Sequence, residues 1–430
     1  MGDPAIHIAH KTTRNAAGGG EARRLWNYEN RMVAIFAACG GVYGIDALAA
    51  YFVMPFIARD LSLSNADVGM LSFAMLIGWS ISGPVVSWIS DKLSRRKPFL
   101  IGVYLMFAAL SVFSALAAGF VTLLVSRLLM GLVEGPAVPL QQAVIAAESS
   151  PHRRAFNIGV AQNFGSQLFG AFLGSLLMVQ LAVSFGWRAA FLVSAVPALI
   201  MAIVIARFVR EPMIANKVVS GSEDGELELF GLLKSRNVVL AALVGAATAS
   251  WSTLLNAFLP LWSVQVLHLS PRLMSIVMAA MGVGGVVSAI VMPWLADRLG
   301  RRPVMILTAV LGAVGPLVAL AGGTPTPILV LGVFIGSLAM AMYPLCCTVA
   351  VEAVPPARAA LASAIVYSLA TMVGGIFGPL AGGFLADRFG LATPLWISAG
   401  MALLAATVSA TIAARAPGAE GLRAKALLLP

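Results

Sequence analysis

The chain has 430 residues, of which 60% are hydrophobic and only 11% charged, and its formal net charge is +10. A soluble domain carries about 25% charged residues, so this composition excludes an ordinary soluble protein. A helix that crosses a bilayer needs roughly 20 apolar residues. Runs of that length recur along this sequence, separated by short polar joints, and they predict an integral membrane protein embedded in a lipid bilayer.

The predicted elements begin with residues 1–31, a polar, glycine-rich segment without the apolar core of a signal peptide. We expect it to be a disordered cytoplasmic N-terminus. Transmembrane helices are expected at 32–58, 66–90, 98–118, 121–147, 157–182, 186–206, 239–267, 273–296, 303–322, 326–350, 360–386 and 392–414. The fold class is therefore all-α with twelve transmembrane helices: a six-helix bundle over 32–206, a cytoplasmic linker over 207–238, a second bundle over 239–414 and a cytoplasmic tail over 415–430.

The positive charges are distributed unevenly about these helices. With both termini cytoplasmic, 23 of the 28 Lys and Arg residues fall inside, four fall outside and Arg127 lies within the membrane. This asymmetry follows the positive-inside rule. The net charge therefore reports topology, and no nucleic-acid partner is expected. The absence of long glycosylated loops fits a bacterial inner (cytoplasmic) membrane.

Two motifs recur across the linker at nearly one spacing. Asp91-Lys-Leu-Ser-Arg-Arg96 follows the second predicted helix, and Asp297-Arg-Leu-Gly-Arg-Arg302 follows the eighth, 206 residues later. Glu148-Ser-Ser-Pro-His-Arg-Arg154 follows the fourth helix, and Glu352-Ala-Val-Pro-Pro-Ala-Arg358 follows the tenth, 204 residues later. The repeat indicates two duplicated six-helix bundles, which places a substrate site at their interface near the middle of the membrane.

The loop after the second and eighth helices resembles the signature loop of the major facilitator superfamily. Ser94 replaces its glycine in the first copy, and Ala289 replaces the leading glycine in the second. The resemblance implies a transporter that works as a monomer, with a cytoplasmic gate whose charges pair across the halves and break on inward opening. Charges that only anchor the topology are the alternative. The gate residues implied are Asp91, Arg95, Arg96, Glu148, Arg154, Asp297, Arg301, Arg302, Glu352 and Arg358.

Three ionisable residues are predicted between the membrane faces, Asp46, Arg127 and Glu134. A charge at this depth costs several kcal/mol. Charged residues are therefore found there mainly where they face a cavity, form an ion pair or take part in the function. Arg127 and Glu134 are seven residues apart, which puts them on one helix face roughly 10 Å apart. We expect a cavity with Arg127 as anion anchor at one level and Asp46 and Glu134 as proton sites deeper. A structural ion pair between the first and fourth helices remains the alternative.

Short sequence patterns around these charges resemble two families within this superfamily. Arg127-x3-Gly131-x2-Glu134-Gly-Pro resembles the fourth helix of the anion:cation symporters, and Phe258-Leu-Pro-Leu-Trp262 resembles an element of their seventh. Tyr43-Gly-Ile-Asp46 is similar to the first helix of the aromatic-acid:proton symporters. In the anion symporters an arginine follows the aspartate, whereas this chain has Ala47. One arginine in place of two indicates a monoanionic substrate.

Polar and aromatic residues on other helices complete the predicted cavity. Their amides and hydroxyls could read a ligand's polar groups, although hydrogen bonding between helices is the blander interpretation. The substrate-contacting residues predicted beside Arg127 are Tyr43, Tyr51, Gln162, Asn163, Trp251, Asn256, Tyr343 and Tyr367.

The sequence therefore predicts a proton-coupled symporter that imports a small organic anion, a monocarboxylate such as an aromatic or sugar acid. A proton-coupled drug or metabolite exporter is the alternative, but the fifth helix lacks the glycine-proline motif of such exporters. An enzyme is not expected, because no nucleophile–base pair or metal cluster appears. A sensor would need an added soluble domain. The three cysteines are interpreted as core residues, and neither a metal nor a cofactor is expected.

Overall fold

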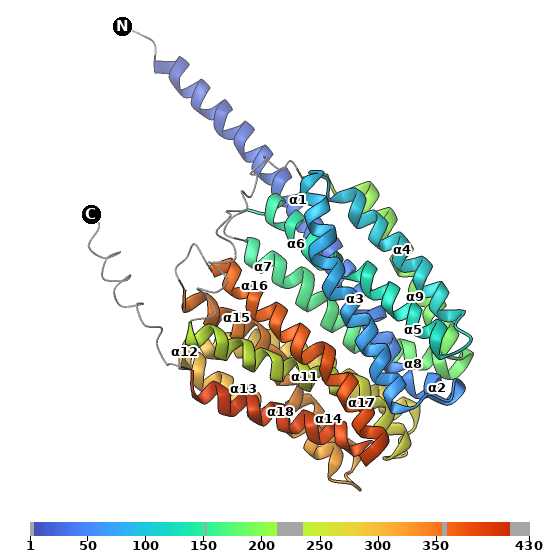
Figure 1. Cartoon of the computed structure of the whole chain (residues 1–430). Helices are drawn as coiled ribbons and strands as arrows, with labels where there is room; N and C mark the ends of the chain where they lie inside the picture. The colour runs from blue at the N-terminus through green and yellow to red at the C-terminus, as the bar shows by residue number, and fades with distance from the viewer. Residues whose placement is uncertain (1–3, 151–152, 213–234, 355–358, 413–430) are drawn as a thin grey trace.

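The computed structural model describes residues 4–150, 153–212, 235–354 and 359–412, without the side chains of residues 4–27, 155, 162–163 and 359–361. Within these ranges twelve helices are long and apolar enough to cross a membrane. This confirms the predicted fold class. They form two groups of six along the chain (Figure 1).

The first half is built from spans one to six. Its elements are α1 (Pro4–Phe52), α2 (Met54–Asp60), α3 (Asn65–Lys92), α4 (Lys97–Ala115), α5 (Phe120–Glu134), α6 (Ala137–Glu148), α7 (Arg154–Gly159), the π-helical η1 (Val160–Phe164) and η2 (Ser166–Leu173), α8 (Gly174–Phe185) and α9 (Trp187–Phe208).

The second half contains spans seven to twelve. Its elements are α11 (Arg236–Gln265), α12 (Pro271–Leu299), α13 (Arg301–Leu320), α14 (Thr326–Gly336), the 3₁₀ segment η3 (Ser337–Ala341), α15 (Met342–Glu352), α16 (Ala359–Leu369), the π-helical η5 (Ala370–Ile376), α17 (Phe377–Phe389) and α18 (Ala392–Ala410).

The start of α1 differs from the sequence prediction. Residues 1–31 were expected to be disordered, but the helix runs without interruption from Pro4 and projects from the bundle (Figure 1). Alanine, arginine and glutamate recur through this stretch, and these residues have high intrinsic helix propensity. Their propensity, together with the continuous spanning helix that follows, offsets the cost of Gly18 to Gly20.

Several spans are interrupted where the sequence predicts single helices. Span four breaks at Gly135–Pro136, between α5 and α6, and span ten passes through the 3₁₀ segment η3. A shift of 204 residues, the spacing of the second repeated motif, carries Gly135 onto Ala339 within η3. The same shift carries the first residue of η2, Ser166, onto the first residue of η5, Ala370. The duplication therefore preserves the helix irregularities as well as the loop motifs.

We call the two ends of the helix bundle the terminal face and the distal face. The terminal face carries the loops at 93–96 and 300 and the start of spans one and seven; the distal face carries the loops at 61–64, 186 and 390. Near the distal face the halves pack closely along α3 with α17 and along α8 and η2 with α12 (Figure 1). Gly69 of α3 lies against Pro379, and Gly383 of α17 against Asn65, with no room for a side chain at either glycine.

Asp387 of α17 fastens this distal contact. Its Oδ1 accepts hydrogen bonds from the backbone N and the side-chain Nδ2 of Asn65, both at 2.9 Å, and its Oδ2 accepts from the backbone N of Ala66 at 2.9 Å. These amides form the N-terminus of α3, where a helix has free donors and a favourable potential for an anion. One carboxylate thus caps a helix of the opposite half.

Candidate functional site

The three ionisable residues predicted inside the membrane are all buried. Asp46 of α1 is 0% exposed, Glu134 at the end of α5 is 1% exposed and Arg127 of α5 is 2% exposed. Arg127 and Glu134 both lie within electrostatic range of Asp46. We call these three residues the charge cluster.

Glycines on α5 bring the charge cluster into place. Arg127, Gly131 and Glu134 share one helix stripe, which is buried. Gly131 lies directly against the carbonyl of Met75 in α3, and a Cβ there would overlap it. This close approach of α5 to α3 also presses the charged side chains of the same stripe into the bundle.

A second glycine contact orients Asp46. Gly44 of α1 packs against the backbone of Ser166 and Gly170 in η2. Each helical residue turns about 100°, so a side chain two positions later points to the opposite side. Asp46 accordingly faces α4 and α9. Its Oδ1 accepts hydrogen bonds from the hydroxyls of Ser111 at 2.9 Å and Ser194 at 3.0 Å.

Arg127 points to the same pair of helices. Its Nη2 donates a hydrogen bond to Ser114 Oγ of α4, and its guanidinium carbon lies 5.0 Å from the ring centroid of Phe191 in α9. The predicted picture, in which Arg127 lines an open cavity between the halves, therefore differs from the structure. The partners of Arg127 and Asp46 all come from the first half, because serines on α4 and α9 offer the nearest polar groups.

The charge cluster keeps unused hydrogen-bonding capacity. Among the described residues no partner is found for Asp46 Oδ2, for Arg127 Nε and Nη1, or for either oxygen of Glu134. Buried polar atoms are nearly always paired in folded proteins. An unpaired group of this kind requires an explanation, and a proton, a water or an anion are the species that could satisfy these atoms.

Aromatic residues of both halves meet beside Glu134. The Tyr343 and Tyr367 ring centroids are 5.8 Å apart, and Tyr367 lies 6.3 Å from Trp79 of α3. Tyr43 lies within electrostatic range of Glu134 and of Tyr367. We call Tyr43, Trp79, Tyr343 and Tyr367 the aromatic cluster. Its Tyr367 is 44% exposed, so this cluster has an open side and the charge cluster does not.

The aromatic cluster only partly matches the prediction. Tyr43, Tyr343 and Tyr367 are brought together as expected, whereas Trp79 was missed. The signal for it was its place in span two, opposite the tyrosines and one residue after Gly78, which packs against Leu128 of α5. Tyr51 is buried in the hydrophobic core. The side chains of Gln162 and Asn163 lie outside the described part of the structure.

Two residues predicted in the substrate cavity, Trp251 and Asn256, each donate a hydrogen bond to a backbone carbonyl. Trp251 is 1% exposed in the core of the second half, where its Nε1 donates a hydrogen bond to the Gly312 carbonyl at 2.8 Å. Asn256 donates through Nδ2 to the Ser252 carbonyl of its own helix at 2.8 Å. The Trp251 bond joins α11 to α13, as the interpretation of hydrogen bonding between helices expects, whereas the Asn256 bond stays within α11. Among the described residues no group of His, Cys, Asp and Glu could hold a metal ion.

A family model described as the Major Facilitator Superfamily matches residues 36–291 and 252–427. The chain belongs to this superfamily. It is 29% identical over 393 residues to the hexuronate transporter of Bacillus subtilis, covering 86% of this chain and 90% of that one. It is 26% identical over 360 residues to the cis,cis-muconate transport protein of Acinetobacter baylyi, covering 80% and 85%. The solved structure of the nucleoside transporter NupG superposes with a TM-score of 0.72 at 15% identity, covering 90% and 99%.

The repeated loops of this superfamily member form ion pairs on the terminal face. Arg96 Nη2 lies 2.7 Å from Asp91 Oδ1 in the first half. In the second half, Arg301 lies 2.6 Å from Asp297 and 3.2 Å from Glu352. Both members of each of these pairs belong to the same half, in contrast to the pairing across halves that the resemblance implies. In the described conformation, these charges do not hold the terminal face together.

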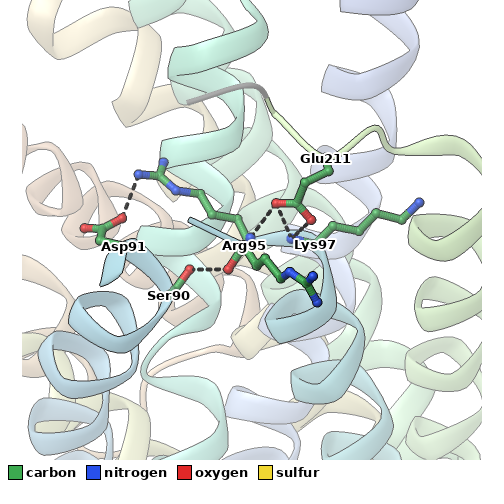
Figure 2. Close-up of polar contacts among 6 residues, drawn as sticks. Ser90, Asp91, Arg95, Lys97 and Glu211 are labelled. Atoms are coloured by element: carbon green, nitrogen blue, oxygen red, sulfur yellow. Dashed lines mark hydrogen bonds and ion pairs between the residues drawn. The ribbon is translucent and has the colours of Figure 1, made fainter. Parts of the chain in front are cut away.

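Three of the other predicted gate residues have exposed side chains, namely Arg95, Arg154 and Arg302. Ser90 Oγ donates a hydrogen bond to the Arg95 carbonyl at 2.8 Å (Figure 2). Glu148 is half-buried near Arg210. Arg358 lies outside the described residues.

Glu211, which the sequence analysis missed, ties the linker to this loop. Its carboxylate accepts hydrogen bonds from the backbone N of Arg96 at 2.5 Å and of Lys97 at 3.1 Å (Figure 2). These amides begin α4, so Glu211 caps that helix. The available signal was its position as the first acidic residue after span six.

Glu29 is a second missed residue. It is 3% exposed, and its carboxylate accepts hydrogen bonds from Ser150 Oγ at 2.7 Å and Asn157 Nδ2 at 2.6 Å. It therefore joins α1 to the loop after span four. The prediction of a disordered segment through residue 31 obscured it. Unlike the carboxylates of the charge cluster, its two oxygens are both satisfied.

Proposed function

We propose that this chain is a proton-coupled symporter that imports a small organic anion, a monocarboxylate such as an aromatic or sugar acid, by alternating access. The observation that carries the proposal is the charge cluster, in which one buried cation stands beside two buried carboxylates with unpaired oxygens. The relatives named for hexuronate and muconate, both organic anions, support the substrate class.

The charge cluster couples protons to anion binding through its net charge. With both carboxylates ionised, the cluster of Asp46, Arg127 and Glu134 carries −1; one bound proton makes it neutral, and two make it +1. At an effective dielectric of about 20, one unit of charge on the cluster changes the energy of an anion about 10 Å away by about 1.7 kcal/mol, or roughly 17-fold in binding affinity. Protonation of the cluster therefore strengthens anion binding, and by reciprocity anion binding strengthens protonation.

The residue roles follow from this arrangement. Asp46 and Glu134 are the proton sites. Arg127, sealed among helices of the first half, acts on the anion through its field in this conformation. Its Nε and Nη1 have no partner among the described residues and can donate in a closer contact. Tyr43, Tyr343 and Tyr367, with Trp79, contact the body of the substrate, since rings can stack on an aromatic acid and on the apolar face of a sugar.

The orientation and conformation are part of the proposal. The charge asymmetry of 23 against four makes the terminal face cytoplasmic. The halves pack closely near the distal face, where Asp387 caps α3. The pairs on the terminal face stay within each half. This combination fits an inward-facing state, in which substrate reaches the aromatic cluster from the cytoplasm.

Uptake into proteoliposomes tests the proposal. Labelled benzoate, glucuronate and lactate, with the lipophilic cation tetraphenylphosphonium, are offered with and without an imposed inward proton gradient. We expect gradient-driven accumulation of at least one acid and none of the cation. A third set of vesicles carries an outward proton gradient, and accumulation of the cation there, without accumulation of any acid under the inward gradient, would replace the proposal with drug export by proton antiport.

Two matched variants locate the coupling. Glu134→Gln is expected to abolish gradient-driven accumulation while leaving exchange of labelled for unlabelled acid across the membrane, because exchange needs no net proton transfer. Glu29→Gln, another buried acid but one whose oxygens are satisfied, is expected to keep the gradient dependence. If Glu134→Gln vesicles still accumulate the acid under the gradient, Glu134 is not a proton site.

A further inference from the structure

A hollow lies on the distal face, and none of its lining residues belongs to the charge cluster. It has a volume of about 490 Å³ and opens among α2, α8 and α9. Ligand pockets of small molecules span about 300–1,000 Å³, so its size suits a small organic molecule or a lipid headgroup. Its lining includes Phe56, Arg59, Asp60, Phe185, Trp187 and Arg188. We call it the distal hollow.

One of the two arginines of the distal hollow is neutralised within the protein. Asp60 Oδ2 accepts hydrogen bonds from Trp187 Nε1 at 2.9 Å and from Arg188 Nη1 at 2.7 Å. These two bonds lower the pKa of Asp60, so this carboxylate is ionised at neutral pH and compensates Arg188. Arg188 also donates to the Ala117 carbonyl at 3.1 Å, which fixes its guanidinium at the rim.

Arg59 is left as the uncompensated cation. Its side chain is exposed, and among the described residues no acidic or hydrogen-bonding partner is found for it. Four arginines are predicted on this face, Arg59, Arg188, Arg272 and Arg388. Two of them line this one hollow, so the distal hollow concentrates the sparse positive charge of the face and carries a net charge of +1.

The remaining walls of the distal hollow are aromatic. Phe56 packs against the core, Phe185 is 76% exposed, and the Trp187 ring lies 4.2 Å beneath the Arg188 guanidinium. A phenylalanine so exposed at a membrane face leaves an apolar surface that a ligand can cover. A single cation beside aromatic walls matches a ligand with one negative charge and an apolar body.

We propose that the distal hollow binds an organic monoanion with an apolar body, held by Arg59 and by the ring of Phe185. Two sources have this chemistry, a soluble aromatic carboxylate and the headgroup region of an anionic phospholipid. The hollow shares no lining residue with the charge cluster. Its Trp187 does stack edge-on against Phe191, the ring that contacts Arg127, so the Arg59→Gln variant below is needed to separate this site from the proposed transport site.

Fluorine NMR of Trp187 tests this site directly. The protein, labelled with 5-fluorotryptophan at its eight tryptophans, is placed in phosphatidylcholine nanodiscs, and the Trp187 resonance is assigned by its loss in Trp187→Phe. Benzoate is then titrated, with benzamide as the uncharged analogue. A second preparation contains phosphatidylglycerol and no benzoate.

A saturable shift of the Trp187 resonance with benzoate and not with benzamide supports a soluble acid as the ligand. A shift on adding phosphatidylglycerol, which then blocks the benzoate response, supports the lipid. In either case Arg59→Gln should weaken the response about tenfold, as expected for loss of a hydrogen bond to a charged group. The matched variant Arg272→Gln, on the same face outside the hollow, should leave it unchanged. No shift with either ligand, or the same affinity in Arg59→Gln, would overturn the proposal.

Discussion

The two halves of the chain share a fold and differ in what they bury. Loop motifs, the interruption of the fourth helix and the π-helical stretch of the fifth recur after about 204 residues. The buried charges do not recur. Residues 204 to 206 positions after Asp46 are Ser250, Trp251 and Ser252; those after Arg127 are Leu331, Gly332 and Val333; those after Glu134 are Leu338, Ala339 and Met340.

This difference separates what the fold needs from what the function needs. In the second half, Trp251 is 205 residues after Asp46 in the sequence, and its one side-chain donor is hydrogen-bonded to the Gly312 carbonyl. In the first half, the corresponding polar atoms of Asp46 and Arg127 are left partly unpaired. A fold that is stable without buried charges in one half does not require them in the other. In the described part of the second half no charged side chain is buried, which supports the proposal that the charge cluster serves the function of the first half.

Removing the cation should have the largest effect. Arg127→Leu introduces the residue that stands 204 positions later and leaves two buried carboxylates without compensation. We expect it to lower the free energy of unfolding by about 3–5 kcal/mol and to reduce acid uptake by roughly 100-fold. Thermal unfolding in detergent and proteoliposome uptake measure the two effects.

A second substitution controls for general damage at this position. Asp46→Asn added to Arg127→Leu removes one of the uncompensated charges and should restore about 1–3 kcal/mol of the lost stability, as coupled neighbours do. Uptake should stay low in the double variant. Strictly additive losses of stability would show that Asp46 and Arg127 do not interact.

Filling a glycine contact should damage both halves alike. A Cβ at Gly170 would overlap the Gly44 backbone, and one at Gly374, 204 residues later, would overlap the Ala246 carbonyl. Overpacking of this kind costs about 1–3 kcal/mol, so Gly170→Ala and Gly374→Ala should lower the melting temperature by similar amounts. Gly102→Ala is the control, since nothing lies within 4 Å of its Cβ position. A large loss in one half alone would contradict a shared packing plan.

The sequence predicted the architecture well, because bilayer thickness and charge asymmetry act on long, simple patterns. Twelve spans were recovered, and the 204-residue repeat also marks the positions of the helix irregularities. The irregularities themselves were not predicted. A π-helical stretch such as η2 depends on how Gly165 and Gly170 pack against α1, and no local sequence pattern encodes that contact.

The sequence predicted which charged residues form the candidate site, but not which way their side chains point. Asp46, Arg127 and Glu134 stand out because charges are rare in a membrane span. Which way they point depends on the neighbouring glycines and on serines such as Ser111 and Ser114, whose role becomes visible only once the helices are packed. Trp251 shows the opposite error: an aromatic residue was assigned to the ligand, although the Gly312 carbonyl of α13 accepts its hydrogen bond.

Trp251→Phe tests that correction. It loses the hydrogen bond to the Gly312 carbonyl and should lower stability by about 1–2 kcal/mol, with the KM for the transported acid unchanged. Tyr367→Ala removes a 44% exposed ring of the aromatic cluster and should do the reverse, raising KM several-fold with little change in melting temperature. A raised KM in Trp251→Phe would return that residue to the substrate site.

The smallest effect is expected at the contact that joins the halves. Asp387→Asn loses the charge of the cap on α3 and should weaken the distal closure by about 1 kcal/mol, or roughly fivefold in population. Electron-spin distance measurements between labels at positions 184 and 272, one in each half, report the change as a larger long-distance fraction. The isosteric control Asp67→Asn alters the carboxylate that accepts from Ser64 N and Oγ in a cap within the first half, and it should leave that distribution unchanged.

The proposed mechanism requires that protons bind to the charge cluster together with the anion. It is tested most directly by adding the transported acid to purified protein in weakly buffered detergent and recording proton uptake with a pH indicator. We expect anion binding to take up protons, and Glu134→Gln to take up measurably fewer protons at equal occupancy. Anion binding without proton uptake, or the same uptake in Glu134→Gln, would contradict it.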